Sequence, residues 1–334
     1  MAIAVALLAF VVGVLLAIWA TERLLEGLIG LALLLRISAF ATGAVFSGLE
    51  AENIAVGLSS GQARASAIAL GTVFGGAIFL VGVALGLGAI LFPLRIALPR
   101  SFLVIFALAP VVAGVALVAP VTPRWAGAVL LVAFALAMVH LVRTHTAGEQ
   151  RIALRSGSTA ELRTHTAGEQ RYLSSDEVEE ALRKRRPVRT VIGLTLVGLV
   201  VITAGGELVA RGAQGLIASL GVPSLVMGMV VTPAAIELEE VFRQAIPSRA
   251  GRHDVSAGNL IGTMLYFVLG NLGLIVLITP VQVDPSVRLL DWPFLVGMTW
   301  IATILLWRGR IGRLGGAFLL GCWALYVALR VLAG

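Results

Sequence analysis

The chain has 334 residues, of which 59% are hydrophobic and only 13% are charged, and its mean hydropathy is +0.99. This composition excludes an ordinary soluble domain, in which about 25% of the residues are charged. The formal net charge is +7, but the basic residues are placed as in the loops between membrane helices, so the charge does not indicate a nucleic-acid partner.

Ten apolar segments, most of them long enough to cross a bilayer, follow one another along the chain. They cover residues 2–34, 38–60, 66–92, 101–119, 124–142, 188–219, 223–246, 255–279, 292–307 and 311–332. The first has neither a charged n-region nor a cleavage site followed by a polar chain, so we interpret it as a retained helix. We therefore expect an all-α polytopic membrane protein with ten transmembrane helices, surrounded by the lipid bilayer.

Residues 143–187 form the only stretch with the composition of a soluble loop, because they hold nine of the 25 basic and seven of the 18 acidic residues. They predict a division into a first five-helix repeat (1–142), a linker (143–187) and a second five-helix repeat (188–334). Within the linker, Arg143–Arg151 recurs as Arg163–Arg171. We interpret this recurrence as a solvated tandem duplication and not as a histidine metal sensor.

The two halves also resemble each other locally. Residues 20–38 run parallel to 206–223, and Gly71–Gly76 runs parallel to Gly258–Thr263. Basic residues gather at alternate loops, so the positive-inside rule predicts a cytoplasmic linker and both termini outside, in a prokaryotic plasma membrane. Five helices per half require the second copy to be inserted upside down, which predicts two inverted repeats.

Acidic residues lie inside two of the apolar segments, one in each half. Glu50 and Glu52 fall in the second segment, and Glu237, Glu239 and Glu240 fall in the seventh. A charged side chain at the bilayer centre costs about 2.5–3.5 kcal/mol on insertion scales, so we expect these acids to have a function. Glycines and prolines interrupt the same two segments, and interrupted segments at matching positions of two halves are typical of a transporter site.

The second half resembles the cation/calcium exchanger superfamily, whose members are sodium/calcium or proton/calcium antiporters. The similarity begins at Gly205–Gly228, and the family signatures G-T-S-x-P-E and G-N-x-x-G-S-N are matched in degenerate form by Ala235–Glu240 and Gly258–Thr263. The resemblance implies alternating-access exchange of Ca²⁺, or a related divalent cation, for H⁺ or Na⁺. It places Glu240 on the family's ion-binding glutamate.

In the first half Leu49–Asn53 occupies the glutamate element, and the residues leave open whether Glu50 or Glu52 is the counterpart of Glu240. The predicted ion ligands are Glu52, Glu240, Glu50, Glu237, Thr263 and Asn259. The hydroxyls next to the family's glutamates are replaced here by Glu50, Ile236 and Glu237, and Gly71–Phe79 has lost the asparagine and the serine. Since these groups help to bind sodium in sodium-coupled members, their absence favours protons as the counter-ion.

Carboxylates together with backbone carbonyls and water suit calcium, which takes six to eight oxygen ligands. The sequence has no phosphate-binding loop and no catalytic nucleophile motif, so we expect neither an enzyme nor a bound cofactor. The single cysteine, Cys322, excludes an internal disulfide. Two alternatives stay open: a non-transporting membrane relative that acts as a scaffold or sensor with a decayed ion site, and a metal-dependent membrane enzyme using Glu237–Glu240. Glu239 is also compatible with an ordinary interfacial ion pair to Arg243.

Overall fold

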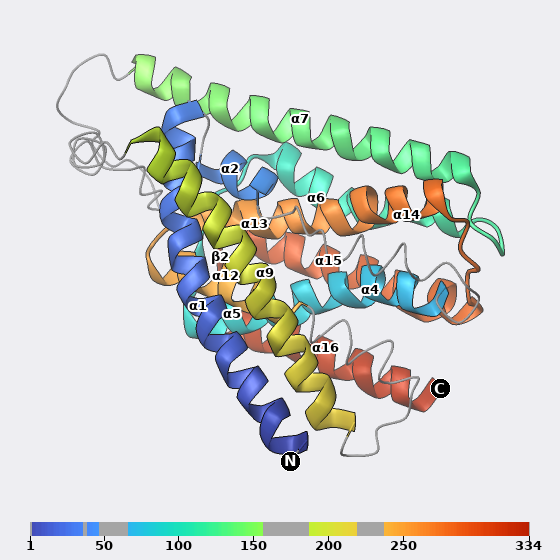
Figure 1. Cartoon of the computed structure of the whole chain (residues 1–334). Helices are drawn as coiled ribbons and strands as arrows, with labels where there is room; N and C mark the ends of the chain where they lie inside the picture. Colours follow the sequence, from blue (N-terminus) through green and yellow to red (C-terminus); the bar gives the residue numbers. More distant parts are fainter. Residues whose placement is uncertain (1, 36–38, 47–65, 156–186, 219–236, 334) are drawn as a thin grey trace.

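The computed structural model describes residues 2–35, 39–46, 66–155, 187–218 and 237–333, and the description below concerns these residues (Figure 1). They form helices joined by short connections, with two strands of two residues each. Eight of the helical stretches in this part of the chain are long and apolar enough to cross a membrane. The expected all-α membrane architecture is thereby confirmed. Most of the second and seventh expected helices lie outside the described residues. Of the glycines and prolines that interrupt these segments, Gly43 lies within the helix Ala39–Phe46 and Pro247 within the helix Leu238–Arg249.

The helices of the first half are α1 (Ala2–Leu35), α2 (Ala39–Phe46), α4 (Ser66–Phe79), α5 (Leu85–Leu91), α6 (Arg100–Ala113) and α7 (Arg124–Arg155). Those of the second half are α9 (Val188–Ala218), α12 (Leu238–Arg249), α13 (His253–Leu265), α14 (Leu272–Ile278), α15 (Trp292–Trp307) and α16 (Arg313–Ala333). The π-helical turns η1 (Leu80–Ala84), η4 (Tyr266–Asn271) and η5 (Val287–Asp291), with the 3₁₀ turn η2 (Gly114–Leu117), continue these helices. The helix expected at 124–142 extends to Arg155, because residues 143–155 contain no proline and are rich in helix-forming Arg, Ala, Leu, Glu and Gln.

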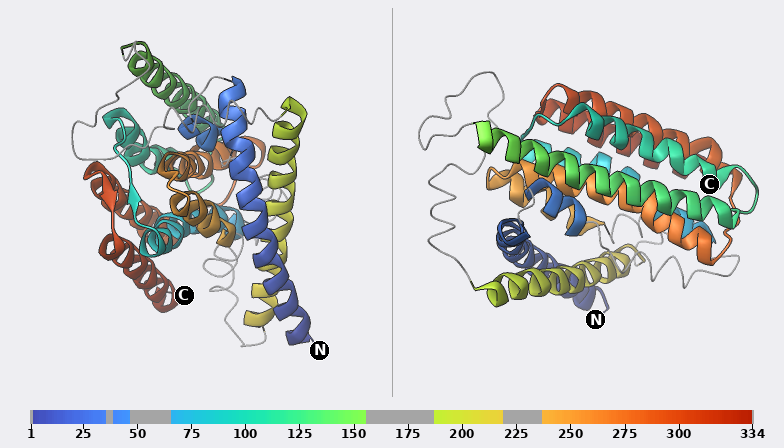
Figure 2. Two further views of the ribbon diagram at one scale, coloured as in Figure 1. Left: turned by 90° about the vertical axis from the view of Figure 1, so that its left-hand side faces the viewer. Right: turned by 90° about the horizontal axis from the view of Figure 1, so that it is seen from above.

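The long helices α1 and α9 pack against each other as an antiparallel pair that is steeply inclined to the other helices (Figures 1 and 2). Three glycines of α9, seven residues apart, lie on the α1 backbone: Gly198 at Leu24, Gly205 at Ala17 and Gly212 at Phe10. A Cβ at each position would come within 3.0 Å of α1 backbone atoms. A seven-residue repeat keeps one face of a helix on its partner, and small residues there allow the close approach that membrane helices use.

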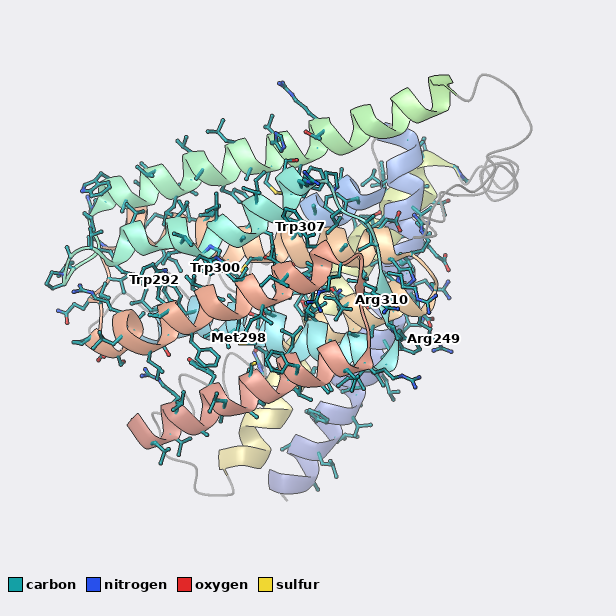
Figure 3. The ribbon with its side chains drawn as sticks, turned by 180° about the vertical axis from the view of Figure 1, so that it is seen from behind. Arg249, Trp292, Met298, Trp300, Trp307 and Arg310 are labelled. Carbon is teal, nitrogen blue, oxygen red and sulfur yellow. The ribbon has the colours of Figure 1, made fainter. Side chains whose placement is uncertain are left out.

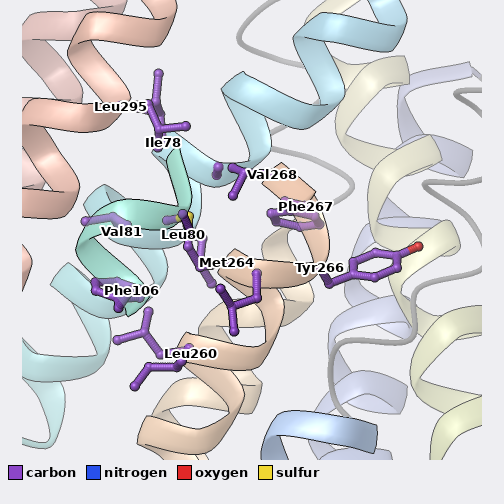
Figure 4. Packing of buried hydrophobic residues seen from close by; sticks show 14 of the residues in the cluster. Ile78, Leu80, Val81, Phe106, Leu260, Met264, Tyr266, Phe267, Val268 and Leu295 are labelled. Carbon is purple, nitrogen blue, oxygen red and sulfur yellow. The ribbon is translucent and has the colours of Figure 1, made fainter. Parts of the chain in front are cut away.

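The remaining helices form a bundle around one hydrophobic core. Side chains from α4 and η1, α6, α13 and η4, and α15 converge in it, among them Leu80, Phe106, Met264 and Leu295 (Figure 4). Each of these four side chains is at most 2% exposed. Because lipid is as apolar as this core, packing and interhelical hydrogen bonds have to hold the helices together, not the exclusion of water.

Helices α5 and α14, one from each half, have the same shape. Helices α5 and α14 are seven residues long, begin 187 residues apart (272 minus 85), and each follows a π-helical turn. Both end in an extended residue, Phe92 with φ −135° and ψ 93° and Thr279 with φ −128° and ψ 110°. A π turn in the middle of a helix is rare, so its occurrence at matching positions is a specific similarity.

Contacts between the halves are reciprocal. Helix α7 packs on α14, and α16 packs on α5. Strand β1 (Leu94–Arg95), after α5, pairs antiparallel with β2 (Arg310–Ile311), before α16. In the same way Gln282, after α14, forms an antiparallel bridge with Val121, before α7. Each contact thus has a counterpart in which the two halves exchange roles. Elements related by a two-fold axis show this pattern.

Tryptophans connect α15 to α6 along its length (Figure 3). The indole of Trp292 donates to the carbonyl of Pro110 at 2.7 Å, and that of Trp300 donates to the carbonyl of Ala107 at 3.1 Å. At the other end of α15, the Arg100 guanidinium lies 5.8 Å from the centre of the Trp307 ring. Arg310 and Arg249 lie at this same end of the molecule (Figure 3).

Candidate functional site

The predicted glutamate Glu240 lies in the first turn of α12, which begins at Leu238 after Glu237. This position is favourable for an acid because the amino end of a helix carries a partial positive charge. The side chain of Glu240 is fully buried, and its Oε2 accepts a hydrogen bond from the amide of Asn259 on α13 at 2.7 Å. The fold therefore joins the two signature segments of the second half directly, across nineteen residues of sequence.

Asn259 and Thr263 lie one turn apart on α13, so they share a helix face. They are 1% and 0% exposed, and the Oδ1 atom of Asn259 and the hydroxyl of Thr263 have no hydrogen-bond partner among the described residues. A buried polar atom without a partner costs free energy, and such atoms in native proteins are rare and call for an explanation. Neutral oxygens beside a buried carboxylate are ligands that a hard cation can use.

Glu237 lies against α4 of the other half. A Cβ atom placed on Gly76 would be 3.3 Å from both the Cγ and the Oε1 atoms of Glu237, so this carboxylate occupies space that a larger residue at position 76 would fill. The sequence had singled out both residues as departures from the exchanger signatures, Gly76 for a lost serine and Glu237 for a lost hydroxyl. The two departures meet in the structure, because the side chain of Glu237, directly before α12, lies in the space that a side chain at position 76 of α4 would occupy.

Arg243 provides a positive charge in the same cluster. Its Nη2 atom lies 2.6 Å from Oε1 of Glu239, and its Nη1 atom donates to Oε1 of Glu240 at 2.8 Å. The exposed fractions of the three side chains are 4% for Arg243, 6% for Glu239 and 0% for Glu240. The expected pair of Glu239 with Arg243 is present, but it is buried. The same guanidinium also contacts Glu240, the predicted ion ligand.

A small cavity lies beside this cluster, between α1, α12 and α13. Its walls include Arg243, Asn259 and Pro247, together with Thr21 and Leu24 of α1. The hydroxyl of Thr21 donates to the carbonyl of Ala17 in its own helix at 2.7 Å, so it does not compete for the cluster's acids. Helix α1 thus borders the space next to the guanidinium.

Two further charged pairs lie within the long helices α1 and α9. Arg23 lies 3.1 Å from Glu26, and Arg211 lies 2.5 Å from Glu207, in both cases within one helix. These exposed pairs contribute about 0–1 kcal/mol each.

A separate buried group connects η5 and α16. Tyr326 donates to Oδ1 of Asp291 at 2.7 Å, and the Arg330 guanidinium lies 3.6 Å from Oδ2 of the same carboxylate.

Of the predicted ligands, Glu240 and Asn259 are in direct contact where α12 and α13 meet. Thr263 lies one turn further along α13, and Glu237 lies against Gly76 of α4. Glu50 and Glu52 lie outside the described residues. In the described part of the chain no three His, Cys, Asp or Glu side chains are grouped as they would be around a metal ion. The described residues around Glu240 therefore supply carboxylate, amide and hydroxyl oxygens, and a complete site requires further ligands.

Two residues of the cluster were not among the predicted ligands. Arg243 was treated only as a partner of Glu239, although its spacing of three and four residues from Glu240 and Glu239 allows contact with both on one helix face. Gly76 was noted only for the serine that the family has there, because a missing side chain does not reveal which group fills its place.

Comparison with known proteins gives a consistent result. A model of the family described as sodium/calcium exchanger protein matches residues 5–143 and 190–332. Among curated proteins, the inner membrane protein YrbG of Escherichia coli (strain K12) is 27% identical over 98% of this chain and 97% of its own length. The putative antiporter CaxA of Alkalimonas amylolytica is 24% identical over 93% of this chain and 92% of its own.

Among solved structures, the sodium-calcium exchanger NCX_Mj soaked with zero Na⁺ and Ca²⁺ superimposes with a TM-score of 0.74. The sequence identity is 20%, and the match covers 97% of this chain and 98% of that one. The overall fold is therefore shared.

Proposed function

Because this chain belongs to the sodium/calcium exchanger protein family, we propose that it is a secondary antiporter that exchanges Ca²⁺, or a related divalent cation, for a counter-ion by alternating access. The observation that carries the proposal is the buried contact of Glu240 with Asn259, next to the unpartnered oxygens of Asn259 and Thr263. An ionisable residue inside a membrane domain that faces other polar groups marks an ion pathway. The name of the relative CaxA, a putative antiporter, agrees with this function.

The proposed architecture is ten helices in two inverted repeats, residues 1–142 and 188–334. The antiparallel packing of α1 on α9 supports the inversion, since these are the first helices of the two halves. The 187-residue spacing of α5 and α14 and the reciprocal strand pairings support it as well. Rocking of one repeat against the other around a fixed site would then expose it to each side of the membrane in turn.

The proposed orientation places the linker in the cytoplasm and both termini outside. Its support is the gathering of Arg249 and Arg310 at one end of the bundle, the same end at which α7 finishes and α9 begins (Figures 1 and 3). Arg95 lies there too, opposite Arg310 in the short ribbon. Cytoplasmic loops carry an excess of arginine and lysine.

In the proposed site, Glu240 and Glu52 bind the cation, assisted by Glu50, Glu237, Asn259 and Thr263. Protons are the favoured counter-ion, because protons and a divalent cation compete for the same carboxylate oxygens. The contact of Glu237 with Gly76 adds weight to this choice, since a carboxylate now stands where the family signatures have hydroxyl groups.

The test is a flux assay with purified protein in liposomes, using radioactive calcium and separately imposed proton and sodium gradients. Calcium uptake driven by a pH gradient supports the proposal. Uptake driven only by a sodium gradient would correct the counter-ion and leave the calcium site in place. Absence of calcium movement under every gradient would refute the exchanger function.

The second candidate, a non-transporting relative with a decayed site, is favoured by one observation: the Arg243 guanidinium already holds an oxygen of Glu240. If the pair were permanent, the cation could not bind there. The same flux assay separates the two functions, because a decayed site gives no gradient-driven uptake.

A further inference from the structure

The guanidinium of Arg243 occupies the position of a cation between two buried acids. It contacts one oxygen of Glu239 and one oxygen of Glu240, at 2.6 and 2.8 Å, and the second oxygen of Glu240 is held by Asn259. Both carboxylate oxygens of the predicted ion ligand are therefore engaged. A cation that binds Glu240 has to replace at least one of these contacts.

We propose that Arg243 is a tethered cation that competes with the transported ion for Glu240, and that it thereby sets the affinity of the site. This inference rests on the exchanger function proposed above. Glu239 is the positioning residue of the device, because it holds the guanidinium when the transported ion takes the oxygen of Glu240.

The chemistry of the guanidinium makes it a competitor and not only a neighbour. Arginine stays protonated under all conditions that a protein experiences, so its charge cannot be removed by losing a proton and the group must move. Its planar fork spans two carboxylates at once, as it does here. When a divalent cation binds Glu240, the carboxylate therefore loses one charge-assisted hydrogen bond and gains a metal–oxygen bond.

The guanidinium has a second partner besides Glu240. Glu239 remains within contact on the same helix, one turn before Arg243. The cavity bordered by Arg243, Pro247 and Thr21 lies directly beside it. If the guanidinium releases Glu240, it therefore keeps Glu239 as its partner.

Two substitutions should change calcium affinity in opposite directions. Arg243→Gln removes the competitor, and since a hydrogen bond to a charged group contributes about ten- to a hundredfold to an equilibrium constant, we expect the calcium dissociation constant to fall by about tenfold or more. Glu239→Gln removes the group that holds the guanidinium away from the site, so we expect the dissociation constant to rise. Arg243→Lys leaves one ammonium, which reaches one carboxylate at a time, and should give an intermediate value.

The measurement is calorimetric titration of purified protein with Ca²⁺ at one fixed alkaline pH, with a thermal unfolding curve for each variant. The matched control is Arg252→Gln, which also removes one arginine near the α12–α13 connection. Arg252 pairs with Asp254 and not with Glu240. Tighter binding in Arg243→Gln, weaker binding in Glu239→Gln and an unchanged control support the proposal. If Arg243→Gln does not fold, the opposite shifts of Arg243→Lys and Glu239→Gln decide the question.

Unchanged or weaker calcium binding in folded Arg243→Gln, or in Arg243→Lys, overturns the competition while the wild-type protein still binds calcium. Absence of calcium binding in the wild type and in every variant overturns the proposed exchanger function along with it.

Discussion

Replacing Glu240 by glutamine tests the site with the smallest possible change. The amide has nearly the same size as the carboxylate but no charge, and a neutral group cannot replace the charge that a divalent cation requires. We expect Glu240→Gln to abolish gradient-driven calcium uptake in liposomes. The protein should still be inserted and folded.

The effect on stability follows from the contacts of the side chain. Removing one partner of a buried ion pair costs about 3–5 kcal/mol when the other charge is left alone. Here Arg243 keeps Glu239, and the amide of Asn259 can turn so that its unpartnered Oδ1 accepts a hydrogen bond from the new glutamine. The free energy of unfolding should therefore fall by only about 1.5–3 kcal/mol, the contribution of one hydrogen bond to a charged group.

The control for this prediction is Glu207→Gln. Glu207 pairs with Arg211 on the exposed side of α9, where the two side chains are 46% and 73% exposed. Such a pair contributes about 0–1 kcal/mol, so this variant should keep both uptake and thermal stability. Uptake at the wild-type rate in Glu240→Gln would show that this carboxylate does not bind the ion, and our reasoning about the site would then be wrong.

Four further variants probe the fold and the linker. Gly262→Val places a side chain against the backbone of α2, so we expect the free energy of unfolding to fall by more than about 2 kcal/mol. Gly297→Val, with open space at its Cβ position, should leave the free energy of unfolding unchanged in the same assay. Deletion of residues 152–171 removes one copy of the linker repeat and should leave calcium flux intact; loss of flux in a correctly inserted protein would contradict a dispensable linker. Asp291→Asn removes the charge facing buried Arg330 and should lower the thermal unfolding temperature while the calcium dissociation constant stays the same.

The class of protein and the identity of its family were available from the sequence. Length and apolarity of the segments predict membrane helices without any tertiary information, because the bilayer imposes both properties on a spanning helix. The signature segments around Glu240 and Asn259 led to the exchanger family, which the family match confirms. The spacing of Gly198, Gly205 and Gly212 was also visible, but which helix they contact was not.

Only the tertiary structure decided which groups the acids of the seventh segment contact. Sequence spacing allows Arg243 to reach Glu239 or Glu240, and the structure places all three side chains in one buried cluster and not at an interface. The contact of Glu237 with Gly76 joins residues 161 positions apart (237 minus 76), in different halves of the chain. The sequence by itself determined which residues are costly to bury in a membrane. The packing of α12 against α13 and α4 decided which of these residues contact one another and so lower the cost of burial, because such contacts depend on distances that no local pattern contains.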